Sequence, residues 1–481
     1  MSIQKAKTNY GVVSGVVNEC CTEFRGVPYA KAPTGELRFK AAVPPTCWDG
    51  ELACVTWPPI AIQRKPEWPP RKEGPFEWIG QEDCLYLNIW TSAETSEDKL
   101  PVIFWIHGGG WIGGDNHNET LDGAAWAKKG VILVSVGYRL GPLGFLGLEE
   151  LAAEDPHGST GNYGLTDIIQ ALKWTKENIG AFGGDPENLT IAGQSSGGMA
   201  VKWLLGCPEA WGLFQRGIAQ SGGGLWDIDY IMTFEEKMAY SRKALELVNW
   251  TVEDLRTRPA EEICDVLTCV MPQLNVPQKS LAANLYQPNM DPWLLKDYYG
   301  VVLDSGDTVD VELMTGTIRG EFNNFKFQVP GGIDGYESEF ALCPGAVWAW
   351  RNQERGKKPV YHYFFDHDLP GENGYPRHAS EMQFTFGRLD PQQRPWERYD
   401  YEISETAVDY WTSFAKTGDP NTPGRPRWNP WTIENPVTMR FANDGIYMAA
   451  LTTRTKAARV AAFMKTKPGI INDPFHDHAG D

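Results

Sequence analysis

Three short, uninterrupted apolar runs constrain the fold of this chain most. They are residues 102–106 (VIFWI), 131–136 (VILVSV) and 189–192 (LTIA). Nearly every position in them is apolar, rather than every second one, which is typical of parallel strands covered on both faces. Between the second and third runs, apolar residues recur at helical spacing over 165–172, and Gly180 is placed to stop that helix. The order strand, helix, strand predicts an α/β fold with a large, mostly parallel central sheet covered by helices on both faces.

The length of the chain allows one large domain or two ordinary ones. It has 481 residues, 42% of them hydrophobic, and its composition shows no clear break. Further strands are predicted at 217–220, 311–317 and 360–364. The stretch from about 227 to 310 contains helical pieces, such as 234–247, but no obvious strand and no linker-like ends. We therefore expect a single domain over 1–481, with about 227–310 as a helical insertion over the face of the sheet that carries the active site.

Charge and terminal sequence limit the partners and the location. The net charge of −18 argues against nucleic acid and anionic membranes as partners. No apolar run approaches the roughly 18 residues of a transmembrane helix. The first eight residues are polar and lack the apolar core of a secretory signal, so we expect a cytoplasmic protein, unless an export signal has been removed. The oligomeric state stays open.

The sharpest local motif is the G-x-S-x-G pattern of residues 193–197 (GQSSG). Alone it is weak, and an ordinary glycine-serine turn is the competing interpretation. Here it follows the strand at 189–192 and precedes a predicted helix at 199–205, which is the context the motif requires. A nucleophilic Ser195 must project from a tight strand-to-helix turn, where Gly193 and Gly197 remove Cβ atoms that would clash. The pattern predicts Ser195 as a nucleophile.

A second glycine-rich motif, residues 107–110 (HGGG), comes directly after the strand at 102–106. Successive glycines let main-chain N–H groups approach a substrate oxygen. We expect Gly109, Gly110 and Ser196 to supply the three N–H donors of an oxyanion hole. A phosphate-binding loop is the rival interpretation, but the lysine of the G-x-x-x-x-G-K-[ST] motif is missing. His107 is expected to brace the loop.

The base that pairs with Ser195 must be a histidine, and two candidates lie in the loop after the strand at 360–364. These are His367 and His378, of which His378 is preferred, although His367 stays open. The others belong to the glycine loop, polar segments, an apolar strand or the C-terminal tail: His107, His117, His157, His362, His476 and His478.

The acidic residue that pairs with the catalytic histidine is the hardest to predict, because the chain contains 62 acidic residues. Glu321 follows the strand at 311–317, and strand ends are where α/β sheets carry catalytic groups. Asp304 and Asp307, in the preceding loop, are weaker rivals. A Ser-His-acid group attacks activated acyl carbons, which include esters, amides and thioesters. No H-E-x-x-H motif, Cys/His cluster or nucleotide-binding glycine motif is present, so no metal or cofactor is expected.

Several segments of the chain resemble the motifs of a known family. Residues 182–197 (FGGDPENLTIAGQSSG) closely resemble the serine signature of type-B carboxylesterases, the cholinesterase-like family. Other similar segments are 24–30 (FRGVPYA), 37–39 (LRF), 82–88 (EDCLYLN), 138–146 (YRLGPLGFL) and 411–420 (WTSFAKTGDP). The resemblance therefore spans nearly the whole chain.

The resemblance implies an α/β-hydrolase fold with a deep gorge above Ser195. It also implies a triad of Ser195, Glu321 and His378, although the usual Asp-Glu-Gly around the acid is Gly-Glu-Phe at 320–322 here. Arg38 and Glu82 match a structural salt bridge of that family.

Two departures from the family pattern narrow the prediction. The cysteine that secreted members bridge to Cys84 is Ala61 here, which favours a reduced, microbial-type protein. The tryptophan of choline-hydrolysing members is Gly74, with Trp78 out of register, so choline esters are not expected. We predict a serine carboxylic-ester hydrolase of small to medium esters, and the 12% aromatic content suggests aryl or hydroxycinnamoyl groups. Amide or thioester hydrolysis, and a binding protein without catalysis, are the alternatives.

Overall fold

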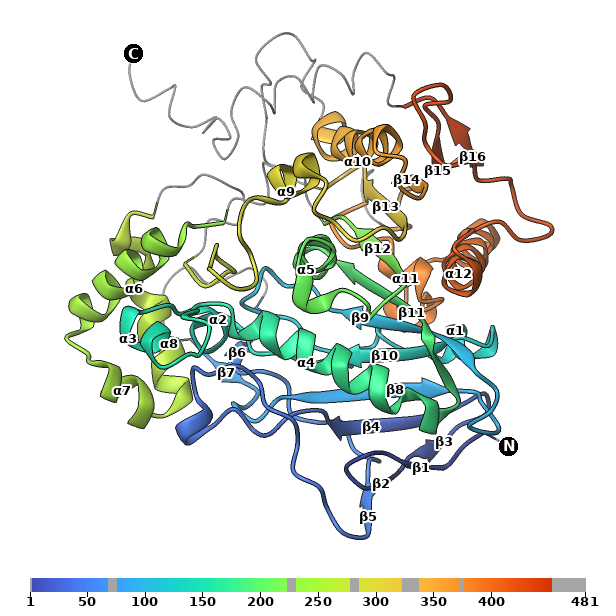
Figure 1. Cartoon of the computed structure of the whole chain (residues 1–481). Coiled ribbons are helices and arrows are strands. Elements are labelled where there is room, and N and C mark those ends of the chain that lie inside the picture. Colours follow the sequence, from blue (N-terminus) through green and yellow to red (C-terminus); the bar gives the residue numbers. More distant parts are fainter. Residues whose placement is uncertain are drawn as a thin grey trace, which may run out of the picture.

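The structure is a computed structural model that describes residues 2–67, 76–222, 231–276, 285–321, 337–371 and 376–451. Most of the described strands form one 11-stranded sheet (Figure 1). The order is β16 (Gly445–Ala449), β15 (Thr438–Ala442), β14 (Val360–Asp366), β13 (Glu312–Ile318), β12 (Arg216–Gln220), β11 (Gly184–Gln194), β9 (Leu100–Ile106), β10 (Ile132–Val136), β8 (Tyr86–Thr91), β4 (Thr22–Pro28), β3 (Val16–Val17). Smaller sheets pair β1 (Lys5–Lys7), β2 (Val12–Ser14) and β5 (Glu51–Ala53), and β6 (Gln63–Arg64) with β7 (Trp78–Ile79).

The predicted α/β fold with a mostly parallel central sheet is confirmed. Neighbouring strands from β15 through β14, β13, β12, β11 and β9 to β10 are parallel, and every strand predicted from the sequence lies within this block. Both ends of the sheet are antiparallel, through β16 at one edge and β8, β4 and β3 at the other. The apolar runs did not predict these outer strands.

Helices cover both faces of the sheet, because successive side chains of each strand enter different cores. On β9, Phe104 packs in the same core as Ile168 of α4 (Tyr163–Asn178). Trp105, the next residue, belongs to the opposite core with Trp126 of α1 (Ala124–Lys128) and Trp411 of α12 (Arg398–Thr417). A strand buried on both faces needs apolar residues at every position, which explains the uninterrupted runs in the sequence.

Tryptophans account for much of this packing. Eight are among the largest side chains with under 2% exposure: Trp90, Trp105, Trp111, Trp126, Trp174, Trp411, Trp428 and Trp431. Large aromatic side chains of this kind contribute much of the apolar area that a core removes from water. The aromatic content is therefore largely core filling, and composition alone carries no argument for an aromatic substrate.

Helix α4 ends differently from the prediction. It is helical to Asn178 and continues as a 3₁₀ turn over Ile179–Phe182, so Gly180 does not stop it. The left-handed residue that ends the turn is Gly183, at φ 78°. A Cβ there would lie 2.2 Å from that of Ala93, so both the backbone angle and the space require glycine.

The described part of the predicted insertion at 227–310 is helical and contains no strand of the sheet. Its helices are α6 (Phe234–Val248), α7 (Val252–Thr257), α8 (Ala260–Val270) and α9 (Tyr299–Ser305). Figure 1 shows α6, α7 and α8 grouped beside α2 (Gly141–Phe145) and α3 (Glu149–Ala153).

Two buried cations connect this segment to the body of the protein. The Lys237 ammonium on α6 donates to the carbonyls of Phe145 at 2.9 Å and Gln287 at 2.7 Å. The Arg38 guanidinium donates to the carbonyl of Leu255 at 2.9 Å. Because these shared contacts are buried, we propose that the helices are an insertion in one domain rather than a second domain.

Within the described ranges, no helix is both long enough and apolar enough to cross a bilayer.

A fully buried ion pair fixes α4 against the segment that follows β10. The Asp167 carboxylate accepts from the Arg139 guanidinium at 2.6 and 2.8 Å and from its main-chain N–H at 3.0 Å. The two side chains are 0% and 2% exposed, so removing one charge leaves the other buried without a partner.

We expect Asp167→Asn to lower the free energy of unfolding by about 3–5 kcal/mol, the usual cost of breaking a buried pair. The measurement is urea unfolding. The control is Glu402→Gln, which removes an exposed pair with Arg398 and should change stability by about 0.5 kcal/mol or less. Equal effects of the two variants would contradict the assigned role of the buried pair.

Candidate active site

Ser195 lies in a strained turn between β11 and α5 (Ser196–Leu205). Its backbone has φ 57° and ψ −128°, and its N–H donates to the Gln220 carbonyl at 2.9 Å. Left-handed angles cost a non-glycine residue free energy, and such residues cluster at functional sites. A Cβ on Gly197 would lie 2.0 Å from the Ile106 carbonyl oxygen, so glycine is required where the turn meets β9.

The predicted Ser195, Glu321 and His378 are brought together by this fold. His378 Nε2 lies 2.8 Å from Ser195 Oγ, and its Nδ1 forms a short hydrogen bond with Glu321 Oε2. Glu321 Oε1 accepts from Thr317 Oγ1 at 2.6 Å and from the Ile318 N–H at 3.1 Å, so the carboxylate is held by the end of β13. The arrangement places an acceptor on one imidazole nitrogen and a hydroxyl on the other.

Burial differs strongly between the two ionisable members. The Glu321 side chain is 3% exposed and that of His378 is 31% exposed, beside a cavity of about 300 Å³. Burial disfavours the charged carboxylate, but the charge and hydrogen bond of His378 outweigh this, and the pKa of Glu321 lies below its ordinary value. Burial likewise disfavours the imidazolium, yet the Glu321 carboxylate raises the pKa of His378. The pair therefore stabilises a positive charge on the imidazole.

The rival histidine, His367, is separated from Ser195. Its Nε2 lies 2.6 Å from Asp400 Oδ1 on α12, and its side chain is buried. His362 lies in the core as expected, with its Nδ1 3.1 Å from Thr438 Oγ1. His476 and His478 fall outside the described residues.

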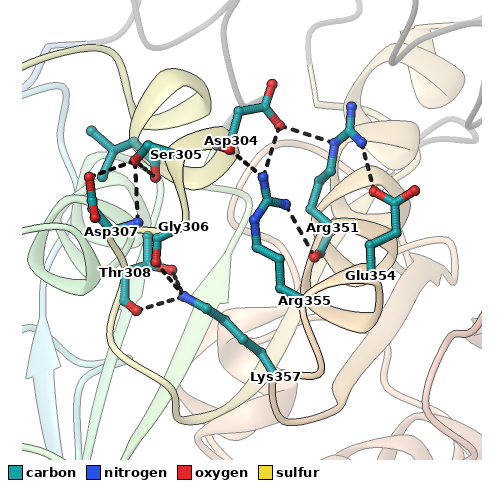
Figure 2. Close-up of polar contacts among 10 residues, drawn as sticks. Asp304, Ser305, Gly306, Asp307, Thr308, Arg351, Glu354, Arg355 and Lys357 are labelled. Carbon is teal, nitrogen blue, oxygen red and sulfur yellow. Dashed lines mark hydrogen bonds and ion pairs between the residues drawn. The ribbon is translucent and has the colours of Figure 1, made fainter.

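The rival acids, Asp304 and Asp307, belong to a different cluster around α9 and α10 (Glu337–Glu354). Figure 2 shows Asp304 paired with Arg351, whose Nε lies 3.1 Å from its carboxylate. Asp307 accepts a hydrogen bond from Ser305 Oγ at 2.9 Å (Figure 2). Neither of these acids contacts His378, whereas Glu321 does.

The glycine loop at 107–110 lies against Ser195. A Cβ on Gly108 would lie 2.9 Å from that of Ser195, and the Gly110 N–H donates to Ser196 Oγ at 3.0 Å. Ser196 is the first residue of α5, where N–H groups have no partner within the helix. The N–H groups of this loop and of α5 therefore lie near the same serine.

His107 braces the loop, as the sequence predicted. Its ring stacks on Tyr138 at 4.4 Å, and the Tyr138 hydroxyl donates to the His107 carbonyl at 2.8 Å. Burial lowers the pKa of His107, so the imidazole is neutral and suited to a structural role.

Comparison with known proteins identifies the family of this chain. The sequence profile described as "Carboxylesterase family" matches residues 2–341 and 336–461. The chain belongs to the carboxylesterase family. It is 32% identical over 474 residues to the para-nitrobenzyl esterase of Bacillus subtilis (strain 168), covering 88% of this chain and 91% of that protein.

Other relatives of this carboxylesterase are similar over nearly their full length. The "Fatty acyl-CoA hydrolase precursor, medium chain" of Anas platyrhynchos is 30% identical over 542 aligned residues, covering 98% of this chain and 94% of that one. Among solved structures, the carboxylesterase EST55 of Geobacillus stearothermophilus at pH 6.2 matches with a TM-score of 0.79 and 30% identity, covering 95% and 99% of the two chains. The fold of this carboxylesterase is thus the α/β-hydrolase fold, and it is a carboxylic-ester hydrolase.

Further positions singled out by the family resemblance lie in the described part of the chain. Arg38 Nη2 donates to Glu82 Oε2 at 2.7 Å, in the predicted salt bridge. Cys84 is a buried free thiol, and Ala61 is buried as well. Trp78 donates to Asp265 Oδ1 at 2.9 Å, whereas Gly74 falls outside the described residues.

Two residues beside Ser195, Glu321 and His378 were missed by sequence reasoning. Glu381, three residues after His378 and just before α11 (Met382–Thr385), is fully buried, and Ser221 has a left-handed backbone at φ 46°. Glu381 Oε1 lies 3.4 Å from the amide of Gln220 and 3.5 Å from Ser221 Oγ. Its Oε2 has no hydrogen-bond partner in the part of the chain that the structure describes. The spacing of three from His378 was the available signal, but an acid at that spacing is too common to predict this contact.

The environment of Glu381 keeps its carboxyl neutral over the acidic range. Burial, together with the Glu321 charge, raises its pKa from 4.5 to about 7. The folded protein therefore holds a proton that the unfolded chain has lost between these pH values. The contribution of this carboxyl to the free energy of unfolding is fully present below about pH 4.5, the pKa of the unfolded chain. It decreases as the pH rises from about 4.5 to 7, and it does not decrease further above that range.

We expect Glu381→Gln to remove this pH-dependent loss. Relative to the parent protein, its free energy of unfolding should improve by up to about 3 kcal/mol between pH 4.5 and pH 8, as the pKa difference implies. Urea unfolding at several pH values measures this. The matched control is the exposed Glu97→Gln, which should follow the parent. A constant difference between Glu381→Gln and the parent across the range would contradict the prediction.

Proposed function

We propose that this carboxylesterase acts through an acyl-enzyme on Ser195, with His378 as general base and Glu321 as its charge partner. The observation that carries the proposal is the 2.8 Å approach of His378 Nε2 to Ser195 Oγ, with Glu321 bound to the other imidazole nitrogen. An acceptor on Nδ1 fixes the tautomer whose Nε2 is free to take a proton.

The reaction would proceed in two matched steps. Ser195 Oγ attacks the acyl carbon as its proton passes to His378 Nε2, and the imidazolium then gives that proton to the departing alcohol. Water next attacks the acyl-serine ester, again losing its proton to His378, and the acid leaves with Ser195 restored. The N–H groups of Gly109, Gly110 and Ser196 are proposed to stabilise the oxyanion in both steps. Gly110 would then exchange its contact with Ser196 Oγ for the oxyanion.

The names of the relatives support small to medium esters as substrates. The Bacillus subtilis relative is a para-nitrobenzyl esterase, which favours aryl-bearing esters, and hydroxycinnamoyl esters are a further candidate group. The Anas platyrhynchos relative is named as an acyl-CoA hydrolase, which favours thioesters as the second candidate class. Kinetics with nitrophenyl esters of increasing acyl length, phenolic esters and acyl-CoA thioesters separate these classes by their kcat/KM values.

We expect Ser195→Ala to lower kcat by roughly 10⁴-fold or more, because no other group supplies the nucleophile. An organophosphonate should add one label to the Ser195 peptide of the parent protein and abolish ester hydrolysis. Mass spectrometry and initial rates measure these outcomes. Labelling at another serine, or near-parental turnover in the variant, would refute the assignment of Ser195.

We expect Glu321→Gln to lower kcat by roughly 10²- to 10⁴-fold with little change in KM, because the imidazolium loses its charge partner. Since the Glu321 carboxylate raises the pKa of His378, the rising limb of kcat/KM against pH should move to lower pH in this variant.

The matched controls are Asp304→Asn and Asp307→Asn, which should stay within about threefold of the parent, since neither acid contacts His378. Collapse of either control with an active Glu321→Gln would mean that the triad has a different acid, while leaving the assignment of Ser195 intact.

A further inference from the structure

Cys20 and Cys21 are free thiols in the hairpin loop between β3 and β4. The Asn18 N–H donates to the Cys21 carbonyl at 2.8 Å and closes the loop. Neighbouring side chains of an extended strand point to opposite faces. This turn instead brings the two thiols together, so that the Cys20 and Cys21 sulfurs lie 3.8 Å apart. The hairpin therefore creates a dithiol from two residues that a strand would have separated.

The dithiol lies between solvent and the core. Cys21 is 1% exposed and packs in an apolar core, whereas Cys20 is half-buried at the edge of that core. The Cys20 sulfur also lies 3.9 Å from the carbonyl oxygen of Ala124, the first residue of α1, a contact that orients the thiol. Residues 18 and 19 of the same loop are exposed. A reagent from solvent therefore meets Cys20 first and finds Cys21 directly beside it.

The protonation state of Cys21 indicates which reagents suit this pair. Burial raises the pKa of its thiol, and the Cys20 thiol and the Glu23 carboxylate raise it further. Alkylation and disulfide exchange require a thiolate, so Cys21 is poorly suited to either. A reaction that consumes two S–H groups and bonds both sulfurs to one atom has no such requirement. A gap of 3.8 Å exceeds the roughly 2.05 Å of a disulfide bond and leaves space for one bridging atom.

The dithiol is separate from Ser195. In the sheet, β4 lies four strand positions from β11 (Figure 1), which at about 4.8 Å per strand is a distance of about 19 Å. Since β4 is antiparallel to β8, and β8 is antiparallel to β10, β4 runs in the same direction as β10, β9 and β11. Cys21 precedes β4, whereas Ser195 follows β11. The two sites therefore lie at opposite edges of the sheet.

We propose that Cys20 and Cys21 form a binding site for a trivalent arsenical, held through both sulfurs. Soft sulfur ligands favour soft centres of this kind. With phenylarsonous acid, each S–H gives its proton to one As–OH group, which leaves as water while an As–S bond forms. Two As–S bonds thus replace two As–O bonds, arsenic remains trivalent and no oxidant is required. The proposal goes beyond ester hydrolysis and does not depend on it.

Intact mass spectrometry with phenylarsine oxide, which hydrates to this acid, tests the stoichiometry and the attachment through two sulfurs. One equivalent should add one phenylarsenic unit and remove two hydrogens, and the labelled peptide should contain Cys20 and Cys21. The adduct should withstand an excess of 2-mercaptoethanol but not of 2,3-dimercaptopropanol, because a sulfur that dissociates stays beside the arsenic while the other holds it. No adduct, an adduct on another cysteine, or one that the monothiol removes would overturn the proposal.

Three cysteine variants test the location, with affinities measured by competition against graded 2,3-dimercaptopropanol. Cys20→Ser and Cys21→Ala each leave one sulfur, so each should weaken binding of the arsenical by about 10²-fold or more, the gain that linking two contacts gives. Cys47→Ser, which removes an exposed free cysteine outside the hairpin, should bind as the parent does. Parental ester turnover establishes that each variant is folded, and Cys20→Ser, at the half-buried position, decides the test if Cys21→Ala does not fold. Unchanged affinity in Cys20→Ser, or an equal loss in Cys47→Ser, would overturn the proposal.

Discussion

The turn at Ser195 holds a serine at φ 57°, a conformation that costs of order 1–3 kcal/mol and persists only where its surroundings enforce it. Here the surroundings are parallel strands that end at one edge of the sheet. The Ser195 N–H is bound to the Gln220 carbonyl at the end of β12, and Gly197 fits against the Ile106 carbonyl at the end of β9. The position of the serine hydroxyl is therefore determined by three neighbouring strands, β9, β11 and β12.

The same edge of the sheet supplies the other members of the site. The end of β13 holds Glu321 through Thr317 and the Ile318 N–H. The glycine loop continues directly from β9, and its Gly110 N–H reaches Ser196. His378 lies on a loop, and its contacts with Glu321 and Ser195 orient its imidazole between residues that follow two strands of the sheet. The sheet thus orients the side chain that we propose as the general base.

Charge at this site is divided between two buried carboxyl groups in opposite states. Glu321 stays ionised because a histidine and hydrogen-bond donors face it, whereas Glu381, facing few donors, has a pKa raised to about 7. The two carboxyl groups are similarly buried, and their pKa values differ because their hydrogen-bond and charge partners differ. Low-dielectric sites generally separate acid and base roles in this way.

The sequence by itself determined the class of fold, and it singled out Ser195 as the proposed nucleophile. Uninterrupted apolar runs require strands buried on both faces, and the glycines around Ser195 fit only a crowded strand-to-helix turn. Both signals are local, so they can be recognised without knowing what packs against them. The choice between His378 and His367, only eleven residues apart in one loop, depended on tertiary structure. Asp400 of α12 binds His367, whereas Glu321, three residues after the end of β13, binds His378. Tertiary structure likewise distinguished Glu321 from Asp304 as the partner of His378. It also formed the antiparallel edges of the sheet and placed Ser221 and Glu381 beside the site, none of which the sequence predicted. Contacts between distant segments depend on which strands become neighbours, and no local pattern of residues encodes that order.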